Sequence, residues 1–201
     1  LFDAFVPNLV ARGPAQVDAV VTGSLSTPRV TGRTHLQGAS LRYGDFPTGL
    51  SGVSGDFIFD TNRMVFDSVT SQVGGGNMLL SGSLTYGNGP PRYDVTARAE
   101  QVRIRYPVGM SWHADGTLRL SGTSQAAVLS GRVAVDRLLM SEGFDMASLL
   151  GAPEATAAAP ANVSAFLRNL ELDVQANTTP DAVLQWPSGR FQSEANVRLR
   201  G

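Results

Sequence analysis

The stretch GGGNMLLSGSLTYGNGPPRYDV, residues 74–95, holds two groups of glycines on either side of a short alternating run. Glycines that cradle a phosphate are followed by a Lys and open a helix, and this stretch has neither. Between the glycines, apolar side chains alternate with serines and a threonine, as in a half-buried β-strand. The apolar residues are Met78, Leu80, Leu84 and Tyr86. The glycines are therefore predicted to form turns or bulges between strands.

The same alternation recurs along the chain. GTLRLSG, residues 116–122, and GRVAVDRL, residues 131–138, place polar or small side chains between apolar ones, and residues 191–200 repeat the pattern. Many short runs joined by turns predict an all-β fold with one continuous apolar face and at most one or two short helices. The apolar residues of these runs assigned to that face are Leu118, Leu120, Val133, Val135, Val197 and Leu199.

Three segments depart from plain alternation. The apolar residues change phase between 93–99 and 102–106, which predicts a β-bulge near Glu100. EGFDMASLLG, residues 142–151, has helical spacing and predicts a short helix that ends at its glycine. Residues 152–161 are rich in Ala and Pro with little to bury, and are predicted to form a mobile loop.

Glycines also precede several of the apolar runs. Gly23, Gly55, Gly82 and Gly116 are predicted to open strands, at separations that vary along the chain. A propeller or a strict solenoid would need a regular period. The irregular spacing favours an elongated meander of related units instead.

Composition limits the classes of function. A chain of 201 residues is expected to form a single β-rich domain over residues 1–201, as a segment of a longer chain because it lacks an initiating Met. A net charge of -1, with 16% charged residues, offers no basic field for nucleic acid. The absence of Cys excludes disulfides, thiolate metal sites and thiol nucleophiles. No apolar run approaches the length of a membrane-spanning helix.

Candidate catalytic residues are few. His35 and His113 lie far apart in the sequence, each within an alternating run, and are predicted to be surface histidines. The aspartates that could supply paired carboxylates follow glycines or strand ends, where Asp serves turns. They are Asp45, Asp56, Asp60 and Asp67. No nucleophile elbow or zinc motif accompanies them, so we expect no enzyme, no cofactor and no metal site.

One cluster mixes arginines with aromatic residues: QVRIRYPVGMSWHADG, residues 101–116. Arg103 and Arg105 could contact a lipid headgroup, or they could be solvated residues on a strand whose other face carries apolar side chains. The arginines are too few for a nucleic-acid path. Trp112 and Trp186 could anchor a rim or pack in a core.

The order of these units carries a family resemblance. It lies in GSLSTPRVTGRTHLQGASLRY from residue 23, GLSGVSGDFIFDTNRMVFDSVTSQVGGGNMLLSGSLTY from residue 49, LSGRVAVDRLLMSEGFDMASLL from residue 129 and NLELDVQANT from residue 169. Together they resemble the C-terminal region of the TamB family of translocation and assembly module proteins, an AsmA-like, bridge-type family. The resemblance covers nearly all of the chain.

The resemblance implies an elongated β-taco, a U-shaped folded sheet with an apolar inner groove. It further implies a periplasmic location, with the parent chain anchored in the inner membrane of a Gram-negative-type bacterium and a TamA-like barrel assembly protein as outer-membrane partner. The implied roles are phospholipid transport and outer-membrane protein assembly. The residues assigned to the apolar face would then line a groove for phospholipid acyl chains.

Other interpretations of the alternating pattern stay open. The chain could be a structural or interaction β-domain with a filled core, such as an adhesin or an autotransporter passenger, or a carbohydrate-active enzyme. An open sheet also has unpaired edges, and the chain has no Lys to block them. We therefore expect the edges to pair with neighbouring units of the same chain, so that copies of this segment associate end to end.

Overall fold

The computed structural model describes residues 9–24, 27–43, 48–87, 89–105, 109–123, 125–141, 169–186, 189–192 and 194–201. Within these ranges the regular structure is all strand, which confirms the predicted all-β class. The strands are β1 (Leu9–Arg12), β2 (Ala15–Ser24), β3 (Thr27–Tyr43), β4 (Leu50–Thr61), β5 (Arg63–Val73), β6 (Gly76–Thr85), β7 (Arg92–Ile104), β8 (Met110–Thr123), β9 (Ala127–Met140), β10 (Leu170–Trp186), β11 (Gly189–Gln192) and β12 (Asn196–Arg200). The predicted helix at 142–151 and loop at 152–161 lie outside the described residues.

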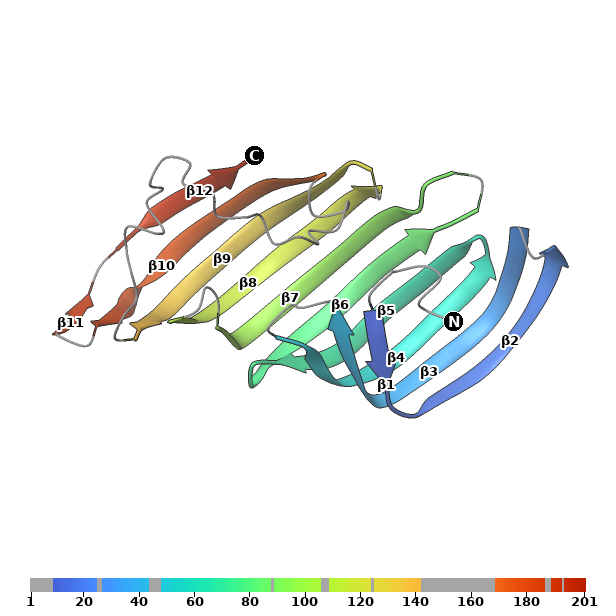
Figure 1. Cartoon of the computed structure of the whole chain (residues 1–201), viewed down its shortest axis with the longest axis horizontal. Helices are drawn as coiled ribbons and strands as arrows, with labels where there is room; N and C mark the ends of the chain where they lie inside the picture. Colours follow the sequence, from blue (N-terminus) through green and yellow to red (C-terminus); the bar gives the residue numbers. More distant parts are fainter. Residues whose placement is uncertain are drawn as a thin grey trace.

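All twelve strands belong to one open sheet (Figure 1). From β3 to β9 each strand pairs with the next along the chain, and every pairing in the sheet is antiparallel except the one between β9 and β10. Both edges are made of two strands placed end to end. β1 and β2 pair with successive parts of β3, and β12 and β11 with successive parts of β10.

The glycines of the opening stretch form the turns that were predicted. Gly74 and Gly75, with φ of 56° and 92°, connect β5 to β6, and Val73 pairs directly with Gly76 across the turn. A two-residue hairpin turn with two positive φ values is the conformation that glycine allows most readily. Gly87 and Gly89 follow in the loop between β6 and β7.

The prediction that glycines open the strands is wrong. Gly55, Gly82 and Gly116 lie inside β4, β6 and β8, and Gly23 lies one residue before the end of β2. The physical reason is visible at Gly82, where φ is 152° and an added Cβ would overlap the carbonyl oxygen of Asp94 on β7. Glycine inside the strand lets the neighbouring backbone approach closely.

Substitution of Gly82 by Ala is expected to destabilise the fold. Backbone strain alone costs on the order of 1–3 kcal/mol in this region of φ, and the neighbouring strand must also shift. Gly89→Ala is the matched control, because Gly89 also has a positive φ of 124° but has open space around its Cα. Urea denaturation should show the larger loss for Gly82→Ala, and equal losses would contradict close strand approach as the cause.

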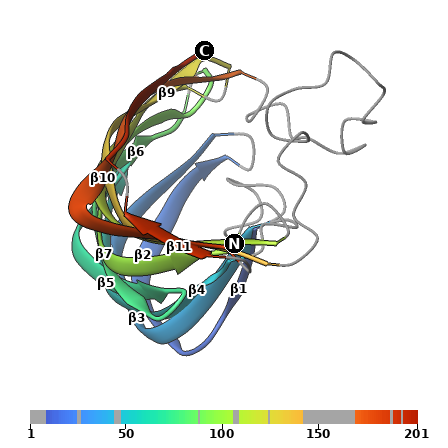
Figure 2. The ribbon, with the colours of Figure 1, turned by 90° about the vertical axis from the view of Figure 1, so that its left-hand side faces the viewer.

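β-Bulges interrupt most of the longer strands. Ser68 in β5 and Gln101 in β7 have φ of 56° and 55°, and the register of their strands shifts at these positions. The bulge at Gln101 confirms the prediction of a phase change near Glu100. Register also shifts beside Gly38 in β3 and Gly52 in β4. Bulges bend strands and increase their twist, and Figure 2 shows the sheet bent into an open, curved trough.

The register gives the sheet one apolar face, which we call the inner face. Residues directly opposite each other on paired strands share a face. One such row runs Val69, Leu80, Ala97, Leu118, Gly131, Val174, from β5 to β10. The opposite, outer face carries rows such as Ser81, Thr96, Arg119, Ser130, Asp173.

Burial is concentrated on the inner face. A buried cluster is formed by Leu36, Ala39, Val53, Phe66 and Val69, with Leu80 and Val95 among the partly buried residues packed against it. Phe57 and Phe66 lie opposite each other with ring centroids 5.5 Å apart. Side chains of a curved sheet converge on its concave side and spread apart on its convex side. We therefore assign the inner face to the concave side of the trough in Figure 2.

Candidate functional site

All predicted groove residues within strands lie on the inner face. Leu80 is opposite Ala97, which in turn is opposite Leu118. Val133 is opposite Ala176, which is opposite Val197 on the edge strand β12. The strand register places the other predicted groove residues on the inner face as well. They are Met78 and Leu84 on β6, Leu120 on β8, Val135 on β9 and Leu199 on β12.

Tyr86 follows β6 directly and continues its alternation. Its backbone N–H donates a hydrogen bond to the carbonyl oxygen of Asn62 at 2.7 Å, which holds the residue beside the β4–β5 turn. The side chain is buried, and burial raises the pKa of its hydroxyl, with a smaller contribution from the carboxylate of Asp60. Tyr86 therefore lies at one end of the inner face rather than along its middle.

Exposure of the inner face varies along the sheet. Val53 and Val69 in β4 and β5 are 0% and 1% exposed. Leu118, Leu120 and Val133 are partly exposed. Leu199 on β12 reaches 48%. The inner face is therefore packed most tightly at β4 and β5, whereas accessible apolar side chains lie on β8, β9 and β12 and also on the edge strand β2, where Val17 and Val21 are 61% and 64% exposed.

Charge is absent from the inner face of the paired strands. Among the described residues that the register places there, side chains are aliphatic, aromatic, Met, Gly, Ser or Thr, and none is Asp, Glu, Arg or His. Soluble proteins seldom leave a contiguous apolar surface of this extent without a partner. The arrangement can hold apolar molecules.

The sequence prediction missed the N-terminal part of this face. Leu36, Phe57 and Phe66 belong to it but were not among the predicted groove residues. The same alternation exists around each of them. Bulges at Gly38, Gly52 and Ser68 change its phase within β3, β4 and β5, so that a fixed period of two does not assemble these residues into one face.

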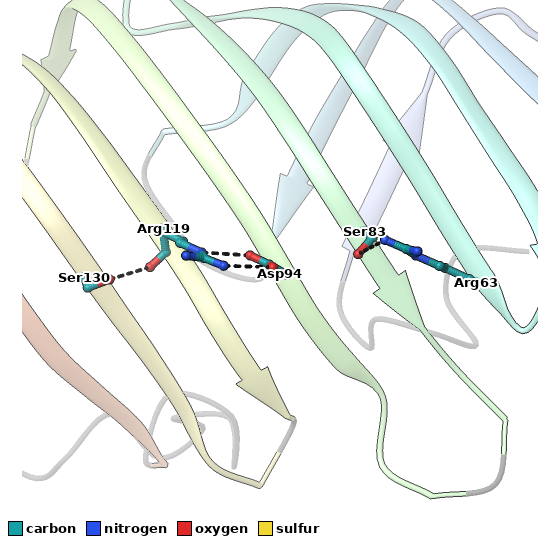
Figure 3. A network of polar contacts seen from close by, with 5 residues as sticks. All are labelled: Arg63, Ser83, Asp94, Arg119 and Ser130. Atoms are coloured by element: carbon teal, nitrogen blue, oxygen red, sulfur yellow. Dashed lines mark hydrogen bonds and ion pairs between the residues drawn. The ribbon is translucent and has the colours of Figure 1, made fainter.

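The outer face carries a polar network (Figure 3). The Arg119 guanidinium donates two hydrogen bonds to the Asp94 carboxylate, each 2.9 Å long. Nearby, Arg63 donates to the Ser83 hydroxyl at 3.4 Å, and the Ser130 hydroxyl donates to the Arg119 carbonyl at 3.5 Å. These residues of β5, β6, β7 and β8 border a shallow hollow of about 460 Å³. The hollow therefore lies on the polar side, away from the predicted groove residues.

The Asp94–Arg119 pair predicts a pH effect on stability. The hydrogen bond from Arg119 lowers the pKa of Asp94 below its ordinary value of 3.8, and the charges of Arg119 and Arg63 act in the same direction. A carboxylate with a lowered pKa contributes stability above its ordinary pKa and loses it as the pH falls through the folded-state value. The contribution is small because both side chains are more than half exposed.

Asp94→Asn should therefore melt slightly below the parent chain at neutral pH, and the two melting temperatures should converge as the pH falls below 3.8. Arg119→Gln removes the same bond from the other side and should show the same convergence. Calorimetric scans of the parent chain and both variants, from neutral to acid pH, measure these melting temperatures. A gap that stays constant at acid pH would contradict the role of the pair.

The candidate catalytic residues lie on the outer face. His35 on β3 is 3.2 Å from Asp56 on β4, measured from Nδ1 to Oδ1, and is about half exposed. His113 lies on β8, opposite Arg103 and Arg137. Asp60 and Asp67 also belong to the outer face, and Asp45 lies outside the described residues. In the described part of the chain, no cluster of three or more His, Asp or Glu side chains is placed to hold a metal ion.

The mixed Arg and aromatic segment divides between the two faces. Arg103 on β7 lies on the outer face and its Nε donates to the Ser111 hydroxyl at 2.9 Å. Val102, Ile104 and Trp112 share the inner face. This arrangement fits the interpretation of Arg103 as a solvated strand residue. The side chain of Trp186 lies outside the described residues.

A protein-family model matches the greater part of the chain. The model of the TamB C-terminal domain matches residues 67–201, which is more than half of the chain. The chain belongs to the TamB family. Comparisons with curated proteins and with solved structures gave no match. The match begins in β5 and runs through β12, so it contains the partly exposed inner-face residues of β8, β9 and β12.

Membership of the TamB family makes this a protein of translocation and assembly in the bacterial envelope. The open, curved sheet agrees with the β-taco that the TamB resemblance implied. In the described residues of this TamB-family chain, no helix is long and apolar enough to cross a membrane.

Proposed function

We propose that this TamB-family chain is a non-enzymatic periplasmic segment that shields phospholipid acyl chains along its inner face. It would thereby support phospholipid transport and protein assembly at the outer membrane. The parent chain would be anchored in the inner membrane and would meet a TamA-like barrel assembly protein at the outer membrane.

One observation carries this proposal: among the described residues that the strand register places on the inner face, none carries a charged side chain. Acyl chains are stabilised on such a surface, because burying apolar area gains roughly 25 cal/mol per Å² and no charged group has to be desolvated. Phosphate headgroups would remain at the open side of the trough, in water.

The accessible part of the inner face is the proposed contact surface. Leu118 and Leu120 on β8 and Val133 on β9 are partly exposed, and Val197 and Leu199 on β12 are about half exposed. Proposed contact is weakest at β4 and β5, where Val53 and Val69 are already covered by protein.

The buried cluster around Val53 and Phe66 favours a second candidate, a structural or interaction β-domain whose core is filled by its own side chains. This candidate predicts no bound lipid. It also predicts that the exposed apolar residues of β12 contact protein rather than acyl chains.

Lipid extraction separates the two candidates. The chain, expressed in the bacterial periplasm and purified without detergent, is extracted with organic solvent, and phospholipid is measured per mole of protein. A periplasmic protein of similar size with a closed core, purified in parallel, is the control for carried-over membrane. Phospholipid well above the control supports the shielding function, and a value equal to the control contradicts it.

A further inference from the structure

Three side chains that can donate hydrogen bonds to an anion lie in a row on the outer face. The register places Arg103 of β7 opposite His113 of β8, and His113 opposite Arg137 of β9. Neighbouring strands lie about 5 Å apart, so the backbones of the two arginines are roughly 10 Å apart with His113 between them. Arg137 is exposed, and Arg103 and His113 are partly exposed. The row is therefore accessible from solvent.

A hydrogen bond fixes the direction of the Arg103 side chain. Its Nε donates to the Ser111 hydroxyl at 2.9 Å, and Ser111 lies on β8, two residues before His113 and on the same face. The guanidinium of Arg103 therefore extends from β7 onto β8, toward the strand that carries Arg137. Because this bond uses Nε, the N–H groups on the two terminal nitrogens can donate to a ligand.

Within the described part of the chain, neither Arg103 nor Arg137 forms an ion pair, whereas Arg119 on the same face pairs with a carboxylate. Carboxylates close to the row in sequence are placed otherwise. Asp115 accepts a hydrogen bond from the Gln101 backbone N–H at 2.6 Å. Asp136 lies at the register shift of β9, and its Oδ1 is buried without a hydrogen-bond partner. Like charges held close together across a sheet destabilise it, and a bound anion relieves this repulsion.

We propose that Arg103, His113 and Arg137 form a binding site for a phosphate group. A guanidinium donates two parallel hydrogen bonds to phosphate oxygens, and the row presents one guanidinium on each side of His113. His113 can donate a ring N–H in either neutral tautomer, and the Ser111 hydroxyl can also donate. Inorganic phosphate and the headgroup of a phospholipid both supply this chemistry. The site lies on the opposite face from the surface proposed to contact acyl chains, so it does not depend on that function.

The chain has two histidines, so their ring signals in NMR spectra report phosphate binding with an internal reference. His113 belongs to the row, whereas His35 lies on β3 beside Asp56. Inorganic phosphate, titrated at constant pH and ionic strength, is expected to shift the ring signals of His113 to saturation and to leave those of His35 in place. Leu118→Asp, which alters the inner face, should not change this titration.

Arg137→Gln should weaken phosphate binding by about tenfold or more, the usual effect of removing a charge-assisted hydrogen bond. Arg103→Gln should act in the same way from the other side of His113. Arg132→Gln is the matched control, because Arg132 is also exposed on the outer face of β9 but lies opposite Thr117, outside the row. It removes the same charge and should leave the affinity unchanged.

Vesicle flotation tests the phospholipid headgroup as the source of phosphate. Vesicles of phosphatidylcholine that contain phosphatidylglycerol are compared with vesicles of phosphatidylcholine alone. Binding of either probe that falls with Arg137→Gln and not with Arg132→Gln supports the site. Such a response to inorganic phosphate alone identifies free phosphate as the ligand, and such a response to phosphatidylglycerol vesicles identifies the headgroup. If neither probe binds, or if the two variants have equal effects on both probes, the proposal is overturned.

Discussion

Phospholipid should be captured by a photo-crosslinking side chain at Leu118, and not by the same side chain at Arg119. Leu118 lies on the inner face, opposite Ala97 and Gly131, whereas Arg119 lies on the outer face and pairs with Asp94. The two positions are adjacent in β8 and differ chiefly in the face they occupy. We therefore expect lipid adducts from Leu118 and almost none from Arg119.

A second pair of positions repeats the comparison on β6. Leu80 lies on the inner face and Ser83 on the outer face, so lipid adducts are expected from Leu80 alone. The variants are irradiated in cells, purified, and analysed by mass spectrometry for lipid-sized mass additions. Adducts to protein alone from Leu80 and Leu118 would favour a filled core over a lipid-contacting surface.

Aspartate at Val53 is expected to unfold much of the protein, whereas aspartate at Leu118 is expected to leave it folded. Val53 is 0% exposed within the buried cluster, so an ionised carboxylate there loses its water without gaining a partner, at a cost of several kcal/mol. Leu118 is partly exposed, and water can follow the carboxylate onto the concave surface. Leu118→Asp should still reduce bound lipid, because it charges the proposed contact surface.

Ile58→Asp is the matched control for Val53→Asp. Ile58 lies on the same strand, on the outer face, and is 47% exposed, so its replacement should change the unfolding free energy by no more than about 0.5 kcal/mol. Urea denaturation followed by circular dichroism measures all three variants. Equal loss of stability for Leu118→Asp and Val53→Asp would indicate that Leu118 is packed as tightly as Val53.

Local sequence was sufficient to predict what depends on one strand at a time. Alternation identified the class of fold, the inner-face residues of β6, β8, β9 and β12, and the bulge at Gln101. A strand exposes its two faces with a period of two, so this information is present in each short run.

Local alternation could not predict how the strands pair with one another. The inner-face residues of β3 to β5 were missed because bulges such as the one at Ser68 change the phase of their alternation. The division of residues 191–200 between β11 and β12, and their placement on the far side of β10, depend on long-range pairing. Strand order and curvature arise from contacts between strands, and no single run contains them.

The parallel pairing of β9 with β10 determines the polarity of the whole sheet. Each antiparallel step reverses strand direction, and this one parallel step cancels a reversal, so that β2 and β12 at opposite edges run the same way. Identical sheets repeated by simple translation would therefore meet with parallel strands at every junction, the slightly weaker arrangement. Antiparallel junctions between two identical edges require a two-fold rotation instead. The single parallel step thus determines that a like sheet added by translation meets this one through parallel strands, and that only rotation gives antiparallel ones.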